Sequence, residues 1–182
     1  MLVALLITCV IAGTGYLWLR TSRTQPAQPA LVEGPEGPSA VPPADGRLAV
    51  VLYLPSEAGL GAAQATIARQ EDAQLEAGAA VAAILASDRG APLLQGEFLL
   101  RGFYLDDAGT AYVALAMQGR REARASAREE LLAIYSVVNT LTMNFPEVRQ
   151  VRFLLDGKEA QTLAGHIDLG RSYAKRIDLV RP

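Results

Sequence analysis

Residues 126–169 constrain the fold most, because they carry start and stop signals for successive elements. Ser126 and Glu129 have the spacing of a capping box, in which each side chain accepts a hydrogen bond from the other residue's backbone N–H. Apolar residues then recur at every third or fourth position until Pro146, which disfavours helical geometry at the residue before it. The pattern predicts a helix that begins after Ser126 and ends by Asn144.

One face of this predicted helix is apolar. Its stripe consists of Leu131, Ile134, Tyr135, Val138, Leu141 and Phe145. Ser136, Asn139 and Thr140 lie largely off the stripe, and we interpret Asn139 and Thr140 as the polar side of the helix. A partner surface at Asn139 and Thr140 is the alternative interpretation.

A hairpin follows the proline. Residues 148–155 alternate between apolar and polar side chains, which is typical of a strand with one buried face. Asp156 and Gly157 are a strong turn signal, because both residues adopt positive φ readily. Residues 158–163 are therefore predicted to return as the partner strand.

The preceding residues supply the rest of the sheet and a second helix. The apolar run at residues 48–54 predicts a buried strand that ends at Pro55. Residues 56–64 are small and glycine-rich, so we expect a loop, with a second strand at residues 65–70. The alanine-rich residues 75–86 predict a helix. Its core face is expected to comprise Leu75, Ala79, Ala82, Ala83 and Leu85.

A second hairpin is predicted from residues 99–105 and 110–117, joined by a turn that contains Asp106, Asp107 and Gly109. Together these elements predict an α+β fold: a small mixed or antiparallel sheet with two helices packed on it.

The first 46 residues differ in character from this domain. Residues 2–19 carry no charge and are long enough, at about 1.5 Å per helical residue, to cross a bilayer. We interpret residues 1–20 as a transmembrane anchor, with a cleaved signal peptide as the alternative. Residues 21–46 hold six of the ten prolines and are predicted to be a disordered linker, which leaves residues 47–182 as the domain.

Few residues suggest chemistry. The net charge of −2 argues against nucleic-acid binding, and Cys9 alone permits neither a disulfide within the chain nor a cysteine zinc site. His166 is the only histidine; without a nucleophile motif or further ligands, we expect its ring to bond backbone groups at a turn after Gly165. Asp106 and Asp107 lack calcium-loop spacing and suit a turn. A basic cluster at Arg120, Arg121 and Arg124 is expected to be solvated. We therefore predict no catalytic, cofactor or metal site.

Four segments together resemble the GerMN domain family of sporulation and spore germination proteins. They are residues 135–142, Phe145-Pro146-x-Val148, residues 151–158 and residues 162–169. The resemblance covers about residues 47–175, with one copy of the domain. One departure is Ala114-Leu115-Ala116, where the family usually carries an Asp-Leu-Ser-like strand end.

The resemblance implies a non-enzymatic α+β domain, tethered by a lipid or membrane anchor outside the cytoplasm, of a type that helps to assemble envelope complexes. It outweighs Arg20 and Arg23, which would by themselves favour a cytoplasmic domain under the positive-inside tendency. We therefore expect a single-pass protein of the plasma or inner membrane, held through residues 2–19. Its domain would bind a protein partner or self-associate; the alternative is a module that binds peptidoglycan or a related cell-wall polymer.

Overall fold

The computed structural model describes residues 46–89, 98–118, 125–159 and 161–181. The expected anchor and linker lie outside these ranges, as do Arg120, Arg121 and Arg124. Among the described residues, no helix combines the length and apolar character needed to cross a membrane.

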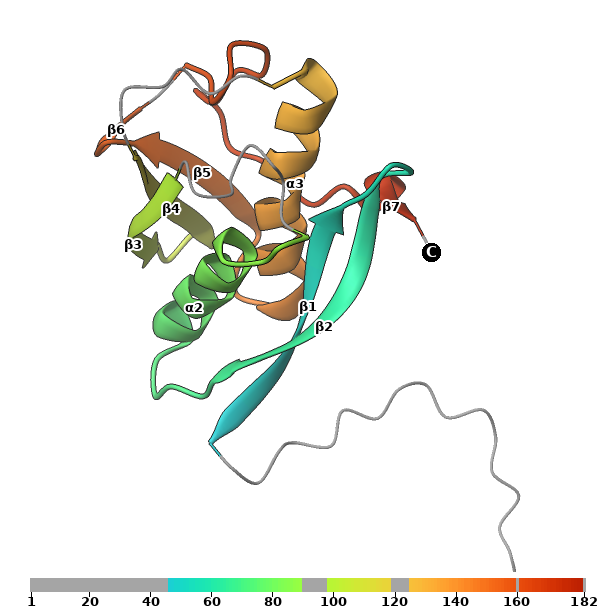
Figure 1. Ribbon diagram of the computed structural model, residues 1–182. Helices are drawn as coiled ribbons and strands as arrows, with labels where there is room; N and C mark the ends of the chain where they lie inside the picture. The colour runs from blue at the N-terminus through green and yellow to red at the C-terminus, as the bar shows by residue number, and fades with distance from the viewer. Residues whose placement is uncertain (1–45, 90–97, 119–124, 160, 182) are drawn as a thin grey trace, which may run out of the picture. The chain divides into compact units, whose positions relative to one another are not determined.

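Two sheets flank the long helix α3 (Figure 1). The first sheet has the strand order β1-β2-β7, and the second has the order β3-β4-β5-β6. The strands of the first are β1 (Arg47–Pro55), β2 (Leu60–Ala68) and β7 (Val180–Arg181). The strands of the second are β3 (Phe98–Leu105), β4 (Thr110–Met117), β5 (Gln150–Leu155) and β6 (Lys158–Glu159). The β1–β2, β3–β4 and β5–β6 pairs are antiparallel, whereas β2–β7 and β4–β5 are parallel. The predicted α+β class is correct, with two small sheets in place of one.

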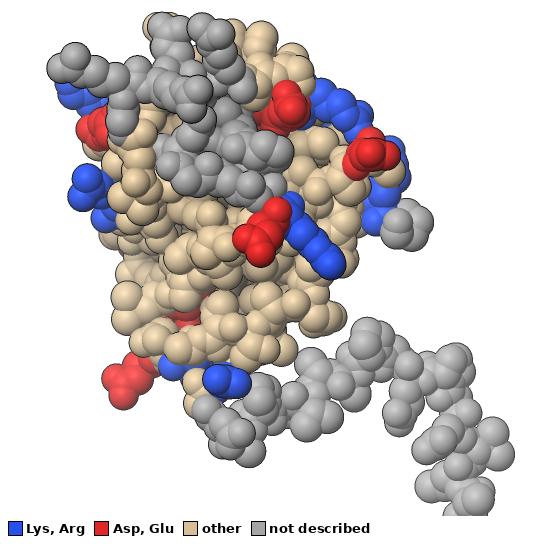
Figure 2. Space-filling view, in the orientation of Figure 1, with Lys and Arg blue, Asp and Glu red and all other residues tan. Residues whose placement is uncertain are grey.

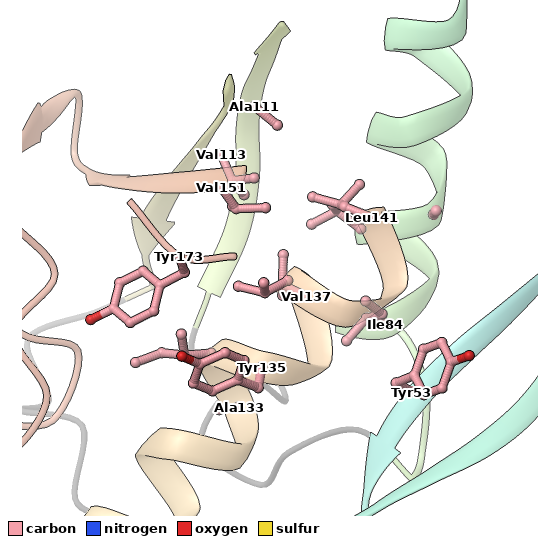
Figure 3. Packing of buried hydrophobic residues seen from close by; sticks show 14 of the residues in the cluster. Tyr53, Ile84, Ala111, Val113, Ala133, Tyr135, Val137, Leu141, Val151 and Tyr173 are labelled. Carbon is pink, nitrogen blue, oxygen red and sulfur yellow. The ribbon is translucent and has the colours of Figure 1, made fainter. Parts of the chain in front are cut away.

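Helix α3 (Ala127–Asn144) is the centre of the core, and its predicted boundaries are confirmed. The capping box is present: the Glu129 N–H donates to Ser126 Oγ, and the Ser126 N–H donates to Glu129 Oε2 at 2.7 Å. These bonds lower the pKa of Glu129. Val137 and Leu141 point from α3 towards Val113 and Val151 of the second sheet (Figure 3).

The three polar residues that lie off the apolar stripe of α3 are buried, so they do not form a solvated side of the helix. Ser136, Asn139 and Thr140 are each 0% exposed. The helix lies between the first sheet and the second, so its polar side faces protein backbone. Asn139 Nδ2 donates to the carbonyl oxygen of Arg176 at 2.9 Å, and the Arg176 N–H donates to Asn139 Oδ1 at 2.9 Å. The Asn139 side chain therefore holds the C-terminal segment.

The C-terminal end of α3 closes the outer edge of strand β1. The Val51 N–H donates to Asn144 Oδ1, and Asn144 Nδ2 donates to the Val51 carbonyl, both at 2.8 Å. The Tyr53 N–H donates to Thr140 Oγ1 at 3.0 Å. Side-chain amide and hydroxyl groups therefore replace the neighbouring strand that this edge lacks.

Two strand predictions need correction. Residues 60–64 were expected in a loop, but β2 begins at Leu60 and pairs with β1 over its whole length. Its small residues form a strand because the β1 backbone is available as a partner, which outweighs their weak strand preference. The return strand predicted at residues 158–163 ends at Glu159. The turn before it is as expected, with φ of 51° at Asp156 and 77° at Gly157.

Candidate functional site

His166 and Asp106, two of the residues weighed as possible site residues, form hydrogen bonds with backbone groups. His166 Nε2 lies 2.9 Å from the carbonyl oxygen of Ala125, which is the backbone contact expected for this ring. Asp106 Oδ1 accepts from the Thr110 N–H at 2.7 Å, as turn formation requires. No group of three or more potential metal-ligating side chains occurs among the residues that the structure describes.

Glu130 is the buried charged group that sequence patterns did not identify. Its carboxylate is 0% exposed and accepts four backbone N–H bonds. Leu163 and Ala164 donate to Oε1 at 2.8 and 2.9 Å, and His166 and Ile167 donate to Oε2 at 2.8 and 3.2 Å. A carboxylate held by so many donors fixes the loop to the start of α3. This is also why the predicted return strand ends early: the N–H groups of Leu163 and Ala164 bond Glu130 instead of a strand.

An apolar groove lies between helix α2 (Ala73–Leu85) and the edge strand β3. It consists of two adjoining hollows of about 400 and 340 Å³, which share Ala82 and Leu100. The first hollow lies towards Leu75 and Phe103, and the second lies towards Leu85 and Leu99. We name this surface, lined by α2 and β3, the α2–β3 groove.

The outward face of α2 explains why the groove is apolar. Of the residues predicted to face the core, Leu75 and Ala82 are exposed at the groove, Leu75 to 59%, whereas Ala79, Ala83 and Leu85 are partly buried against the core. The buried face comprises Glu76, Ala77, Gly78, Ala80, Val81 and Ile84. Because α2 is apolar on nearly every side, its periodicity did not identify the core face. The only charged residue of α2, Glu76, is buried, and Figure 2 shows a surface over α2 that is almost entirely uncharged.

Packing and a side-chain bond fix the walls of the groove. A side-chain carbon at Gly78 would lie 3.5 Å from Phe103 Cβ, so α2 and β3 approach each other closely at this glycine. The Leu105 N–H donates to Gln74 Oε1 at 2.7 Å, which ties the end of β3 to the start of α2. The groove is therefore preformed, while Leu75 and Leu99 remain 59% and 45% exposed.

A second exposed surface is an aromatic row on the outer face of the second sheet. Tyr104 of β3 lies opposite Tyr112 of β4, with ring centroids 6.1 Å apart, and Tyr112 lies opposite Arg152 of β5. Tyr104 is 60% exposed. Arg152 Nη2 donates to Glu159 Oε1 at 2.7 Å, so its guanidinium is held beside the sheet. The row offers ring faces and hydroxyl groups to solvent.

Comparison with solved structures identifies the class of fold. The tandem GerMN domains of the sporulation protein GerM from Bacillus subtilis have 16% sequence identity and a TM-score of 0.53, over 70% of this chain and 46% of that chain. The first GerMN domain of the same protein has 16% identity and a TM-score of 0.48, over 72% and 99% of the two chains. A provisionally assigned lipoprotein from Clostridium perfringens has 20% identity and a TM-score of 0.49, over 72% and 88%. The tandem structure shows that the chain shares the GerMN fold.

The sequence match extends this to the family. Residues 51–161 match the family Germane, described as sporulation and spore germination. The match spans more than half of the 182 residues. The chain therefore belongs to the Germane family, and the resemblance noted from its sequence is confirmed. A search of curated proteins found no match.

Proposed function

We propose that this chain is a non-enzymatic interaction domain of the bacterial envelope, of the sporulation and germination type, that binds a protein partner through the α2–β3 groove. The observation that carries the proposal is the groove itself: a preformed apolar hollow beside a helix whose only charged residue is buried, with Leu75 and Leu99 exposed at its rim. Exposed apolar patches of this kind are typical of protein-binding sites. A partner that inserts apolar side chains would fill the hollows and bury both leucines.

The proposal places the domain outside the cytoplasm, held to the membrane through residues 2–19. The uncharged length of that segment and membership of the Germane family support this placement. A reporter enzyme that is active only outside the cytoplasm, fused after Pro182, tests it. Activity of the fusion in intact cells supports the placement, and an inactive fusion of normal abundance contradicts it.

Site-specific photo-crosslinking in the bacterium that encodes the chain tests the groove. A photoreactive residue placed at Leu75 is expected to give a covalent adduct with an envelope protein, identified by mass spectrometry. The matched control is Met143, a 42% exposed apolar residue on α3 that does not line the groove. The adduct should form at position 75 and be lost in a Leu99→Arg background. Equal adducts from positions 75 and 143, or none from position 75, would contradict the assignment.

A second candidate function is the binding of a cell-wall polymer. The aromatic row favours it, because sugar rings stack on exposed aromatic faces and Arg152 lies at the end of the row. Retention of the full chain on purified cell wall, reduced at least 10-fold by Tyr104→Ala and unchanged by Leu75→Ala, would support this function. Retention that Tyr104→Ala leaves unchanged would contradict it.

A further inference from the structure

The outer edge of β2 has backbone groups that nothing in the described structure pairs. The N–H groups of Val51 and Tyr53 point away from β2, towards α3. Because bonding direction alternates along an antiparallel strand, Val50 and Leu52 bond to their opposite residues Ala65 and Ala63. The intervening residues Ala62, Gln64, Thr66 and Ala68 therefore direct their N–H and C=O groups outwards. Strand β7 pairs in parallel beside Leu60 and Gly61 and takes up the N–H of Ala62, so the edge that is open to another strand runs from Gln64 to Ala68.

This edge lacks the features that protect the other strand edges. Strand β3 has a register shift between Leu100 and Gly102, beside the exposed Arg101, and Gln74 binds its last N–H. Strand β6 consists of two charged residues, Lys158–Glu159. By contrast, β2 has no charge, no proline and no register shift against β1. Charges, prolines, bulges and short strands are the usual means of preventing unwanted strand pairing.

We propose that β2 is a homodimerisation strand, which pairs antiparallel with β2 of a second copy about a two-fold axis at Ala65. In this register Gln64 lies opposite Thr66 of the other copy, and Thr66 lies opposite Gln64 of that copy. Each of these opposed pairs joins two residues whose N–H and C=O groups point outwards. The two strands can therefore exchange hydrogen bonds at these positions, as antiparallel pairing requires. The surface is distinct from the α2–β3 groove, so the two proposals stand or fall separately.

A second copy suits this edge because β2 is complementary to itself. Two-fold pairing brings each residue against its own strand, so any charge would meet a like charge or need an opposite partner. The exposed side chains of β2 are alanine, glutamine and threonine, which place neither charge nor bulk in the way of a second strand. Arg69, the first charged residue after β2, is turned aside: its N–H donates to the Gly46 carbonyl at 2.8 Å, and its guanidinium lies 3.8 Å from the Glu76 carboxylate.

A charge exchange at two positions tests both the dimer and its register. The full chain is purified in a density-matched detergent, and its mass is measured by sedimentation equilibrium over protein concentrations up to about 1 mM, the range of weak association. The parent should pass from monomer to dimer. The variant Q64K/T66K opposes like charges, so its dissociation constant should rise at least 10-fold. The variant Q64K/T66E opposes unlike charges at the same positions, so it should dimerise at least as well as the parent.

Disulfide crosslinking provides a second test at the same positions. In a Cys9→Ser background, a mixture of the Gln64→Cys and Thr66→Cys chains should crosslink faster than either chain alone. As a control, the Gln64→Cys chain is mixed with an Ala49→Cys chain, whose cysteine is at an exposed position on β1. This mixture should crosslink no faster than either chain alone. A parent that stays monomeric, a Q64K/T66K variant that dimerises like the parent, or a Q64K/T66E variant as weak as Q64K/T66K would overturn the proposal. Circular dichroism of each variant shows that a lost dimer is not a lost fold.

Discussion

The two outer edges of the β1–β2 pair differ in whether their outward backbone groups are hydrogen-bonded. Along β1, Asn144 and Thr140 of α3 bond the outward backbone groups of Val51 and Tyr53. Along β2, the outward groups of Gln64 and Thr66 have no such partner in the described structure. One strand is closed by a helix packed against it, and the other is left available for pairing.

The difference shows what closing an edge requires. Thr140 is fully buried, and a buried hydroxyl is costly unless it is hydrogen-bonded. Helix α3 meets this requirement by directing its polar side chains at backbone groups of other segments. Glu130 binds the loop at residues 163–167, and Asn139 binds Arg176. These polar residues of α3 are therefore part of the fold, whereas the exposed Gln64 and Thr66 of β2 have no side-chain hydrogen bond to the residues that the structure describes.

The largest expected effect comes from removing the charge that holds the loop. Glu130→Gln keeps the volume of the side chain but turns an NH₂ group towards two N–H donors. It should lower the free energy of unfolding by about 3 kcal/mol, because buried N–H groups lose a charged acceptor. Chemical denaturation followed by circular dichroism measures the change.

Glu129→Gln is the matched control for this prediction. Glu129 is exposed on the same turn of α3 and bonds only within the capping box. We expect it to cost much less than Glu130→Gln, because water replaces the lost capping bonds of an exposed side chain. Equal losses from the two substitutions would show that the four bonds to Glu130 do not set the stability of the loop.

The second-largest expected effect comes from one substitution, threonine to valine, made at the closed edge of β1 and on β2. Thr140→Val removes the hydroxyl that accepts from the Tyr53 N–H, so it should lower the free energy of unfolding by about 1–3 kcal/mol. Thr66→Val makes the same change on the exposed face of β2 and should alter that free energy by no more than about 0.5 kcal/mol. Thermal unfolding of both variants at low protein concentration measures the difference. A loss at Thr66 as large as that at Thr140 would mean that the Thr66 hydroxyl has a partner within the chain.

Local signals predicted the elements whose boundaries depend on neighbouring residues. The capping box at Ser126, the stop before Pro146 and the Asp156-Gly157 turn all act over a few positions, and each is present in the structure. The predicted turn at Asp106 is present too, where the Asp106 side chain bonds Thr110 four residues later.

Long-range partners decided the features that sequence patterns missed. The outward face of α2 cannot be told from its inward face when both are alanine-rich, so the α2–β3 groove was not predicted. The bonds of Asn144 and Glu130 join residues 93 and 33–37 positions apart. One signal was available: Asn139 and Asn144 stand among the apolar residues of the second half of α3, where a polar side chain that is not exposed usually bonds another segment.

The smallest expected effect tests whether a buried polar residue of α3 stabilises the fold when it has no hydrogen-bond partner. Ser136 is fully buried, and its Oγ has no hydrogen-bond partner among the described residues. Ser136→Ala removes an unsatisfied hydroxyl and adds helix propensity, so the free energy of unfolding should stay the same or rise by up to about 1 kcal/mol. Ser126→Ala is the same substitution where the hydroxyl does have a partner, and it should lower that free energy by about 1 kcal/mol. Denaturant titration of the two variants against the parent measures both signs. A loss at Ser136 as large as that at Ser126 would mean that the buried hydroxyl stabilises the fold, and that α3 has no polar residue without a bonding role.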